Sequence, residues 1–191
     1  MNNKEITILN CDTFLKESIS KSRSALFLDR DGVIIKDTGY ISKAKDVSLE
    51  LGIKNILKNA FQLNIPVIIV TNQSGISRGY YSWDDFDKVN KRMFQLIGEP
   101  SPIVGIYANS HLHLSKDNWR KPNPGMILSA AKKFQINLKK SIFIGDRHSD
   151  MIAGCKSGIK TLVHVRTGHG KQEYNNILEY CKDGYFLADN M

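Results

Sequence analysis

The sequence of 191 residues has little that would mark a secreted or membrane protein. Its three cysteines, Cys11, Cys155 and Cys181, are scattered and odd in number, which argues against a disulfide framework and suits a reducing compartment. No segment approaches the roughly 18 consecutive apolar residues that suggest a membrane span. The N-terminus lacks the charged start and apolar stretch of a signal peptide. We therefore expect a cytoplasmic protein without a membrane partner.

The sequence also lacks any concentration of charge. Lysine and arginine number 27 against 19 acidic residues, a formal net charge of +8. These basic residues are spread along the chain, and no basic run is interleaved with the aromatic residues that a nucleic-acid surface would use. The excess instead suits an enzyme that attracts a small anionic substrate. The partner we expect is a small phosphorylated metabolite rather than a nucleic acid, and the protein is expected to be a monomer.

Short apolar runs alternate with helical patterns from residue 25 onward. This alternation predicts a three-layer, doubly wound α/β fold in which a parallel sheet lies between helices, with residues 25–191 as one domain. Residues 1–24 precede the first core strand and are expected to form an outer helix or a loose arm. The expected strands are Ala25–Leu28, Pro66–Val70, Val104–Tyr107, Ile142–Ile144, Thr161–Val165 and a weak Tyr185–Leu187. The expected helices are Leu49–Leu63, one capped by Ser82, and others near Gly125–Phe134, Ser149–Ser157 and Gln172–Tyr180.

Polar side chains follow several of these strands. Asp29 and Asp31 come directly after the first strand, and Asp146 follows the strand at Ile142–Ile144. Ligands of parallel sheets bind at the carboxyl ends of the strands, so these carboxylates should meet. Carboxylates are suitable ligands for Mg²⁺ together with substrate phosphate. A divalent cation site at this edge is one reading, and a solvated acidic turn is the alternative for Asp29 and Asp31 taken alone.

Two further segments offer groups for binding phosphate. Thr71 closes the second strand, where its hydroxyl and the following amides can hydrogen-bond an anion. Arg120 and Lys121 precede Pro122 and Pro124, which stiffen the loop that carries the two cations. Each segment alone is also compatible with an ordinary polar or basic loop.

Together these segments resemble the haloacid dehalogenase-like phosphohydrolase superfamily over nearly everything after Ser24. The resemblance implies that Asp29 attacks phosphorus and that Asp31 protonates the leaving group. Thr71 and Lys121 would bind the transferring phosphate, and Asp29, Asp31 and Asp146 would hold Mg²⁺, with the main-chain carbonyl of Asp31 as its ligand. An acid must be protonated to act, so a raised pKa is predicted for Asp31. The motifs are FLDRDG (Phe27–Gly32), VTNQSG (Val70–Gly75), RKPNPGM (Arg120–Met126) and IGDRHSD (Ile144–Asp150).

A closer resemblance is to the branch that contains D-glycero-D-manno-heptose-1,7-bisphosphate phosphatases and histidinol-phosphate phosphatases. It rests on Gly39–Tyr40, Thr71–Ser82 and Val165–Gly170 as well as the motifs above. The short spacing between the first two motifs leaves no room for a large cap domain. The branch implies a magnesium-dependent phosphatase of a sugar phosphate, most specifically heptose 1,7-bisphosphate, in lipopolysaccharide biosynthesis. The residues expected to bind substrate are Arg30, Tyr40, Asn72, Arg120 and Arg147.

The sequence departs from this branch at its zinc loop. Where the branch usually carries Cys and His ligands, this chain has Asn109, His111, Asp117 and Trp119, so a single histidine remains. A tetrahedral zinc site requires several such ligands, and no Zn²⁺ is expected here. His111, His113 and Asp117 are the residues that could assemble a substitute site.

Other functions remain open from the sequence. Histidinol phosphate is an alternative substrate, and polynucleotide 3′-phosphatases share the DxDG start, the TNQ-G element and the RKP stretch. A phosphate-binding protein without turnover is an alternative of another class. The intact Asp29, Asp31, Lys121 and Asp146 argue against that last reading.

Overall fold

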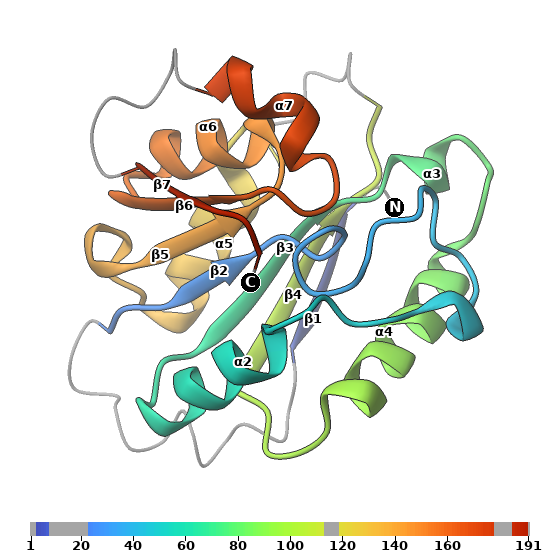
Figure 1. Cartoon of the computed structure of the whole chain (residues 1–191), viewed down its shortest axis with the longest axis horizontal. Helices are drawn as coiled ribbons and strands as arrows, with labels where there is room; N and C mark the ends of the chain where they lie inside the picture. Colours follow the sequence, from blue (N-terminus) through green and yellow to red (C-terminus); the bar gives the residue numbers. More distant parts are fainter. Residues whose placement is uncertain (1–2, 8–22, 113–118, 178–184, 191) are drawn as a thin grey trace.

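The computed structural model describes residues 3–7, 23–112, 119–177 and 185–190. Seven strands form one sheet in the order β1-β4-β3-β2-β5-β6-β7 (Figure 1). Every neighbouring pair is parallel except β1 and β4, which are antiparallel. The α/β fold class predicted from the sequence is confirmed. The strands are β1 (Asn3–Thr7), β2 (Leu26–Leu28), β3 (Val67–Asn72), β4 (Ile103–Asn109), β5 (Ile142–Gly145), β6 (Thr161–Val165) and β7 (Tyr185–Ala188).

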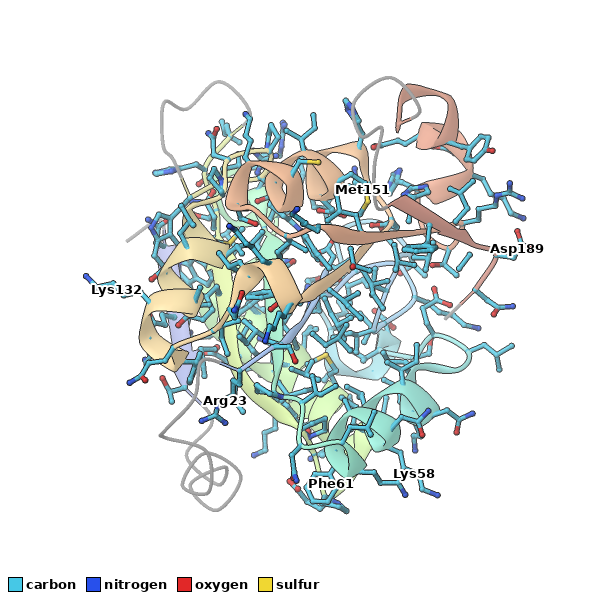
Figure 2. All side chains as sticks on the ribbon, turned by 90° about the vertical axis from the view of Figure 1, so that its left-hand side faces the viewer. Arg23, Lys58, Phe61, Lys132, Met151 and Asp189 are labelled. Carbon is cyan, nitrogen blue, oxygen red and sulfur yellow. The ribbon has the colours of Figure 1, made fainter. Side chains whose placement is uncertain are left out.

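Helices cover both faces of the sheet. Two apolar clusters on opposite faces form the core, because successive strand side chains point to opposite sides: Phe27 joins one cluster, whereas Leu26 and Leu28 join the other. In Figure 2 the side chain of Lys132 extends outward, while Met151 is fully buried. The cluster of Leu26 and Leu28 packs under α2 (Ile53–Gln62) and α4 (Trp83–Ile97), and that of Phe27 under α5 (Gly125–Phe134) and α6 (His148–Ser157).

The helices begin close to where the sequence predicts them. The Ser82 hydroxyl accepts a hydrogen bond from Asp85 N at 3.2 Å, and the Asp85 carboxylate accepts one from Ser82 N at 3.0 Å. This capping box satisfies the free amides at the start of α4, as the predicted N-cap requires. The remaining short elements are α3 (Ser74–Ser77), α7 (Gly170–Ile177), η2 (Ala44–Asp46) and η3 (Leu138–Lys140).

The N-terminal segment differs from its prediction. Residues 3–7 form neither an outer helix nor a loose arm but the edge strand β1, paired with β4 from Asn3↔Asn109 to Thr7↔Gly105. The prediction missed this strand because its sequence, NKEIT, is mostly polar and half exposed, as an edge strand can be. Residues 8–22 lie outside the described residues, so a domain boundary at residue 24 stays a prediction. None of the described helices has the length and hydrophobicity needed to cross a membrane.

The order of the strands places a ligand site at the sheet's centre. From β2 the chain moves outward through β3 to β4, and then crosses to β5 on the other side of β2. The direction of winding therefore reverses between β2 and β5. In open α/β sheets, the crevice outside the carboxyl ends of the strands at such a reversal is where ligands bind.

Candidate active site

Three aspartates meet at this reversal. Asp29 directly follows β2, Asp146 directly follows β5, and Asp150 lies in the first turn of α6. One carboxylate oxygen from each lies within 4.8 Å of the others, and all three side chains are buried. Within the part of the chain that the structure describes, this is the only cluster of three or more side chains suited to binding a metal.

The electrostatics of this cluster favour a divalent cation. Burial, and then the charges of Asp29 and Asp150, raise the pKa of Asp146 to about 9. Burial also raises the pKa of Asp150, to about 6, although Lys121 opposes this. Oδ2 of Asp146 accepts a hydrogen bond from His169 N at 2.8 Å, whereas its buried Oδ1 has no hydrogen-bond partner among the described residues. A buried carboxylate oxygen left over beside other carboxylates fits a hard cation such as Mg²⁺.

Lys121 joins two of the carboxylates. Its Nζ lies 2.9 Å from Asp29 Oδ1 and 2.7 Å from Asp150 Oδ1, and it donates to Val70 O at 2.8 Å. Burial would lower the pKa of Lys121, but the charges of Asp150 and Asp29 outweigh it and raise that pKa. The Asn72 amide bonds both main-chain groups of Lys121, at 3.0 and 3.1 Å. Lys121 is thus a charged ammonium held in one place beside Asp29.

Asp31 is held by a separate set of contacts. The Arg30 guanidinium donates to it from Nη2 at 3.0 Å, and Gln73 Nε2 donates to it at 2.7 Å. Burial raises the pKa of Asp31 and the charge of Asp29 adds to this, while Arg30 opposes it. The rise has the direction that the sequence predicted. The carboxyl is oriented, 20% exposed and inclined to keep its proton, as a general acid must be.

Behind Asp31, Gln73 connects several groups. Its Nε2 also donates to Thr71 Oγ1 at 2.8 Å, and its Oε1 accepts from the Tyr81 hydroxyl at 2.6 Å and from Arg30 at 3.1 Å. Arg30 is 1% exposed and donates from Nη1 to Asn90 at 3.1 Å. Thr71, an expected phosphate ligand, is therefore held in the same network as Asp31.

Two arginines are the chain neighbours of site residues: Arg120 precedes Lys121, and Arg147 follows Asp146. Arg147 Nη2 lies 3.5 Å from Asp37, and Arg120 Nη1 donates to His111 O at 2.8 Å. Burial, and then the positive charges of the neighbouring Arg147 and Arg78, lower the pKa of Arg120. Tyr40 is 52% exposed and packs edge-on against Tyr80 with ring centroids 4.6 Å apart.

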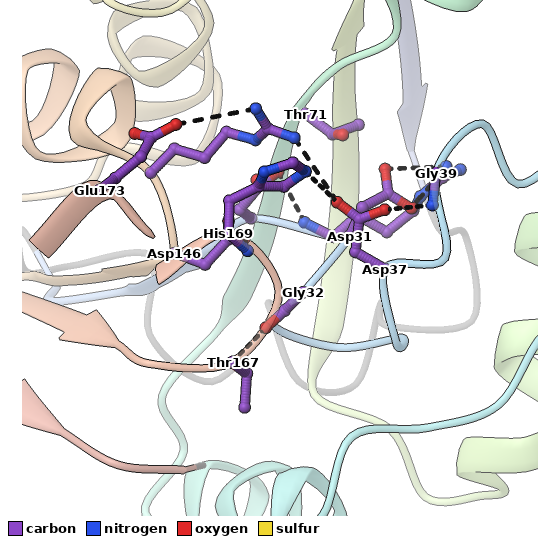
Figure 3. A network of polar contacts seen from close by, with 12 residues as sticks. Asp31, Gly32, Asp37, Gly39, Thr71, Asp146, Thr167, His169 and Glu173 are labelled. Carbon is purple, nitrogen blue, oxygen red and sulfur yellow. Dashed lines mark hydrogen bonds and ion pairs between the residues drawn. The ribbon is translucent and has the colours of Figure 1, made fainter. Parts of the chain in front are cut away.

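The loop after β6 contacts the site through Thr167 and His169 (Figure 3). Thr167 donates to Gly32 O, and the His169 ring lies 3.2 Å from Asp37. Gly32 has a φ of +81°, and a Cβ on it would lie 2.5 Å from Asp146 Oδ2. Only glycine therefore fits at this position, both for backbone conformation and for space.

The structure brings together Asp29, Asp31, Thr71, Lys121 and Asp146, as expected from the sequence. Arg30 and Asn72, expected to bind substrate, contact other residues of the site: Arg30 orients Asp31, and Asn72 orients Lys121. Their role in substrate binding stays a prediction, as do those of Tyr40, Arg120 and Arg147. Sequence reasoning assigned no role to Gln73, Asp37, Arg78 or His169. Gln73, Arg78 and His169 lie inside the motifs that carry the family resemblance, which was the available signal, whereas Asp37 stood out only as an ordinary loop charge.

Comparison with known proteins agrees with this fold and site. A family model described as HAD-hydrolase-like matches residues 118–189. The chain is 42% identical over 172 residues to the D-glycero-beta-D-manno-heptose-1,7-bisphosphate 7-phosphatase of Helicobacter pylori, covering 88% of this chain and 97% of that protein. It is 40% identical to the D-glycero-alpha-D-manno-heptose-1,7-bisphosphate 7-phosphatase of Campylobacter jejuni, covering 81% of this chain and 92% of that protein.

Among solved structures, D,D-heptose 1,7-bisphosphate phosphatase from B. bronchiseptica, complexed with magnesium and phosphate, has the same fold. Its TM-score is 0.78 at 23% identity, and the match covers 87% of this chain and 93% of that one. An α/β core with this arrangement of carboxylates and lysine defines a phosphatase of the haloacid dehalogenase-like type. The chain belongs to this family, within the branch that contains the heptose-bisphosphate phosphatases.

Proposed function

We propose that this chain hydrolyses the 7-phosphate of D-glycero-D-manno-heptose 1,7-bisphosphate. The names of its relatives in Helicobacter pylori and Campylobacter jejuni support this substrate. Relatives named for the beta and the alpha anomer are 42% and 40% identical to this chain, so overall similarity does not choose between the anomers.

The observation that carries the proposal is that Asp29 contacts the Lys121 ammonium and also belongs to the carboxylate cluster with Asp146 and Asp150. Asp29 would attack phosphorus while the bond from phosphorus to the sugar oxygen breaks, and Asp31 would give its proton to that oxygen. Asp31 would then take a proton from the water that cleaves the aspartyl-phosphate, which restores both residues. Lys121 and Thr71 would hold the phosphate oxygens during both steps.

We further propose that Asp29, Asp146 and the main-chain carbonyl of Asp31 hold Mg²⁺. When bound, the ion would supply positive charge next to the phosphate oxygens. Asp150 would support the site through Lys121, since its Oδ1 contacts that ammonium and its Oδ2 caps α6 by accepting from Arg147 N at 3.0 Å. The proposed site contains no Zn²⁺. The expectation that the chain binds no zinc stays a prediction, because His113 and Asp117 lie outside the described residues.

The arginines Arg78, Arg120 and Arg147 support a substrate with a second phosphate. Burial, and then repulsion by the charges of Arg147 and Arg78, lower the pKa of Arg120. A group with two negative charges would relieve that repulsion, which a substrate with a single phosphate, already bound at Lys121, would not do. This arrangement favours a sugar bisphosphate over histidinol phosphate.

The test is phosphate release in Mg²⁺ from a panel of substrates. The panel contains both anomers of heptose 1,7-bisphosphate, histidinol phosphate, a 3′-phosphorylated oligonucleotide and an aryl phosphate. We expect kcat/KM to be highest for a heptose bisphosphate, with loss of the 7-phosphate visible by phosphorus NMR. Preferential turnover of histidinol phosphate or the oligonucleotide would overturn the substrate, and no turnover of any panel member would overturn the activity.

A further inference from the structure

The first residue of β1 lies at the catalytic edge of the sheet. Because β1 runs antiparallel to β4, its start is next to the carboxyl end of β4, and Asn3 pairs with Asn109. The Asn3 side chain is exposed, whereas that of Asn109 is completely buried. Asn109 Nδ2 donates to Asn3 Oδ1 at 2.5 Å. The N-terminal strand thus contacts the point where the chain leaves the sheet toward Arg120.

Hydrogen bonds continue from Asn109 to Arg120. Asn109 Oδ1 accepts from His111 N at 3.0 Å, and His111 O accepts from Arg120 Nη1 at 2.8 Å. A main-chain N–H can only donate, so the Asn109 oxygen must face His111 and its NH₂ must face Asn3. The His111 amide therefore sets the orientation of the Asn109 side chain, and the Asn109 NH₂ in turn requires the side-chain oxygen of Asn3 to face it.

A second contact from the same face of β1 leads to Trp119, the residue before Arg120. Two residues after Asn3, Glu5 accepts a hydrogen bond from the Tyr107 hydroxyl at 3.2 Å. The Tyr107 ring lies 6.0 Å from the ring of Trp119, which immediately precedes Arg120. Lys133 on α5 contacts both Glu5 and Thr7, which fixes this face of the strand. The opposite face of β1 is separate, since Lys4 pairs with Asp87 on α4 at 2.5 Å.

We propose that β1 braces Arg120, with Asn3 as a positioning residue that acts through Asn109 and His111. The functional part of this inference rests on the proposed role of Arg120 in holding the second phosphate. The catalytic residues Asp29, Asp31 and Lys121 make none of these side-chain contacts, so the brace affects substrate binding and leaves the chemical steps intact.

Hydrogen exchange tests the brace without any substrate. The variant Asn3→Leu removes the acceptor, Asn3→Asp keeps it, and Lys4→Ala perturbs the other face of the same strand as a matched control. We expect faster exchange at His111 and at the amides next to Arg120 in Asn3→Leu, and exchange close to wild type in Asn3→Asp and Lys4→Ala. Equal exchange in Asn3→Leu and Lys4→Ala would overturn the brace. Because Asn3 is exposed, these variants should all fold.

Kinetics then test the consequence for substrate. Asn3→Leu should raise KM for heptose 1,7-bisphosphate about three- to tenfold, the size expected for one lost hydrogen bond, with kcat unchanged. KM for an aryl phosphate should not change, and Asn3→Asp should restore KM for the bisphosphate. An equal rise for both substrates, or a fall in kcat, would overturn the positioning role. If the heptose bisphosphate is not a substrate at all, the proposed function fails. The exchange experiment still decides whether β1 braces Arg120.

Discussion

The Nζ atom of Lys121 lies 2.9 Å from an oxygen of Asp29, in a site where both side chains are nearly inaccessible to solvent. In the proposed mechanism, this ion pair would offset part of the charge that the Asp29 carboxylate brings toward a phosphate dianion. It also offsets the cost of burying Asp29 and Asp150 beside Asp146. If the proposed mechanism holds, catalysis and stability therefore depend on the same cation.

Replacing that cation should destabilise the protein. Lys121→Met leaves buried carboxylates without their partner, which typically costs about 3–5 kcal/mol. In a domain of this size we expect a fall in Tm of roughly 10 °C in EDTA at neutral pH, measured by circular dichroism. Lys132→Met, at an exposed position on α5, is the matched control. A fall no larger than that of the control would show that the pair does not stabilise the fold.

Asp31→Asn should separate the two chemical steps. An aryl phosphate has a good leaving group, so formation of the aspartyl-phosphate should proceed without an acid. Its hydrolysis lacks the base, so turnover should fall by about 10²- to 10⁴-fold. Rapid mixing should show a burst of phenolate of about one equivalent per enzyme, followed by a slow phase. Slow release of phenolate without a burst would show that Asp31→Asn does not slow hydrolysis of the aspartyl-phosphate selectively.

The Arg30 guanidinium should control the pH dependence through Asp31. Its charge lowers the pKa of Asp31 against the upward effect of burial. Arg30→Gln removes this charge, so the pKa of Asp31 should rise and the acid should keep its proton to higher pH. The basic limb of kcat/KM for a poor leaving group should then move to higher pH. Arg92→Gln, an exposed control on α4, should leave the limb in place, and a downward shift in Arg30→Gln would contradict this account.

The pKa of Asp146, raised to about 9 by burial and its neighbouring carboxylates, has a consequence for stability. The unfolded value is about 3.9, so the folded state binds the proton more tightly and loses stability as pH rises between these values. Asp146→Asn cannot ionise. In EDTA its Tm should exceed that of the wild type by a few degrees at pH 8, and the gap should narrow toward pH 5.

Magnesium should reverse this order. Added Mg²⁺ is expected to raise the Tm of the wild type and to have little effect on Asp146→Asn, because binding to the native state stabilises by mass action. Scans from pH 5 to 9 with and without Mg²⁺ measure both effects. A wild type that is more stable than Asp146→Asn at pH 8 in EDTA would contradict the raised pKa.

The sheet and its ends were predictable because their residues respond to local rules. Apolar runs such as Pro66–Val70 form strands buried on both faces, and Ser82 followed by Asp85 forms a capping box. Asp29 and Asp146 could be placed together because strand ends of a parallel sheet share one edge. Edge strand β1 could not be found in this way, since none of its five residues is buried and its sequence carries no apolar run.

The supporting contacts of the site were not predictable from the sequence. Gln73 contacts Asp31 and Thr71 through side-chain geometry that no spacing rule specifies. Asn90 is a polar residue in α4 whose burial becomes understandable only with the Arg30 guanidinium beside it. The approach of Gly32 to Asp146 likewise depends on how two loops from distant parts of the chain pack together.

The most direct test of the central claim is to locate the covalent intermediate. Asp31→Asn is mixed with an aryl phosphate and Mg²⁺, quenched in acid and digested for peptide mass spectrometry. Asp29→Asn/Asp31→Asn is the control. The account predicts one added phosphoryl group on the peptide that contains Asp29, and none in the control. A phosphoryl group on another residue, or turnover that persists in Asp29→Asn, would contradict it.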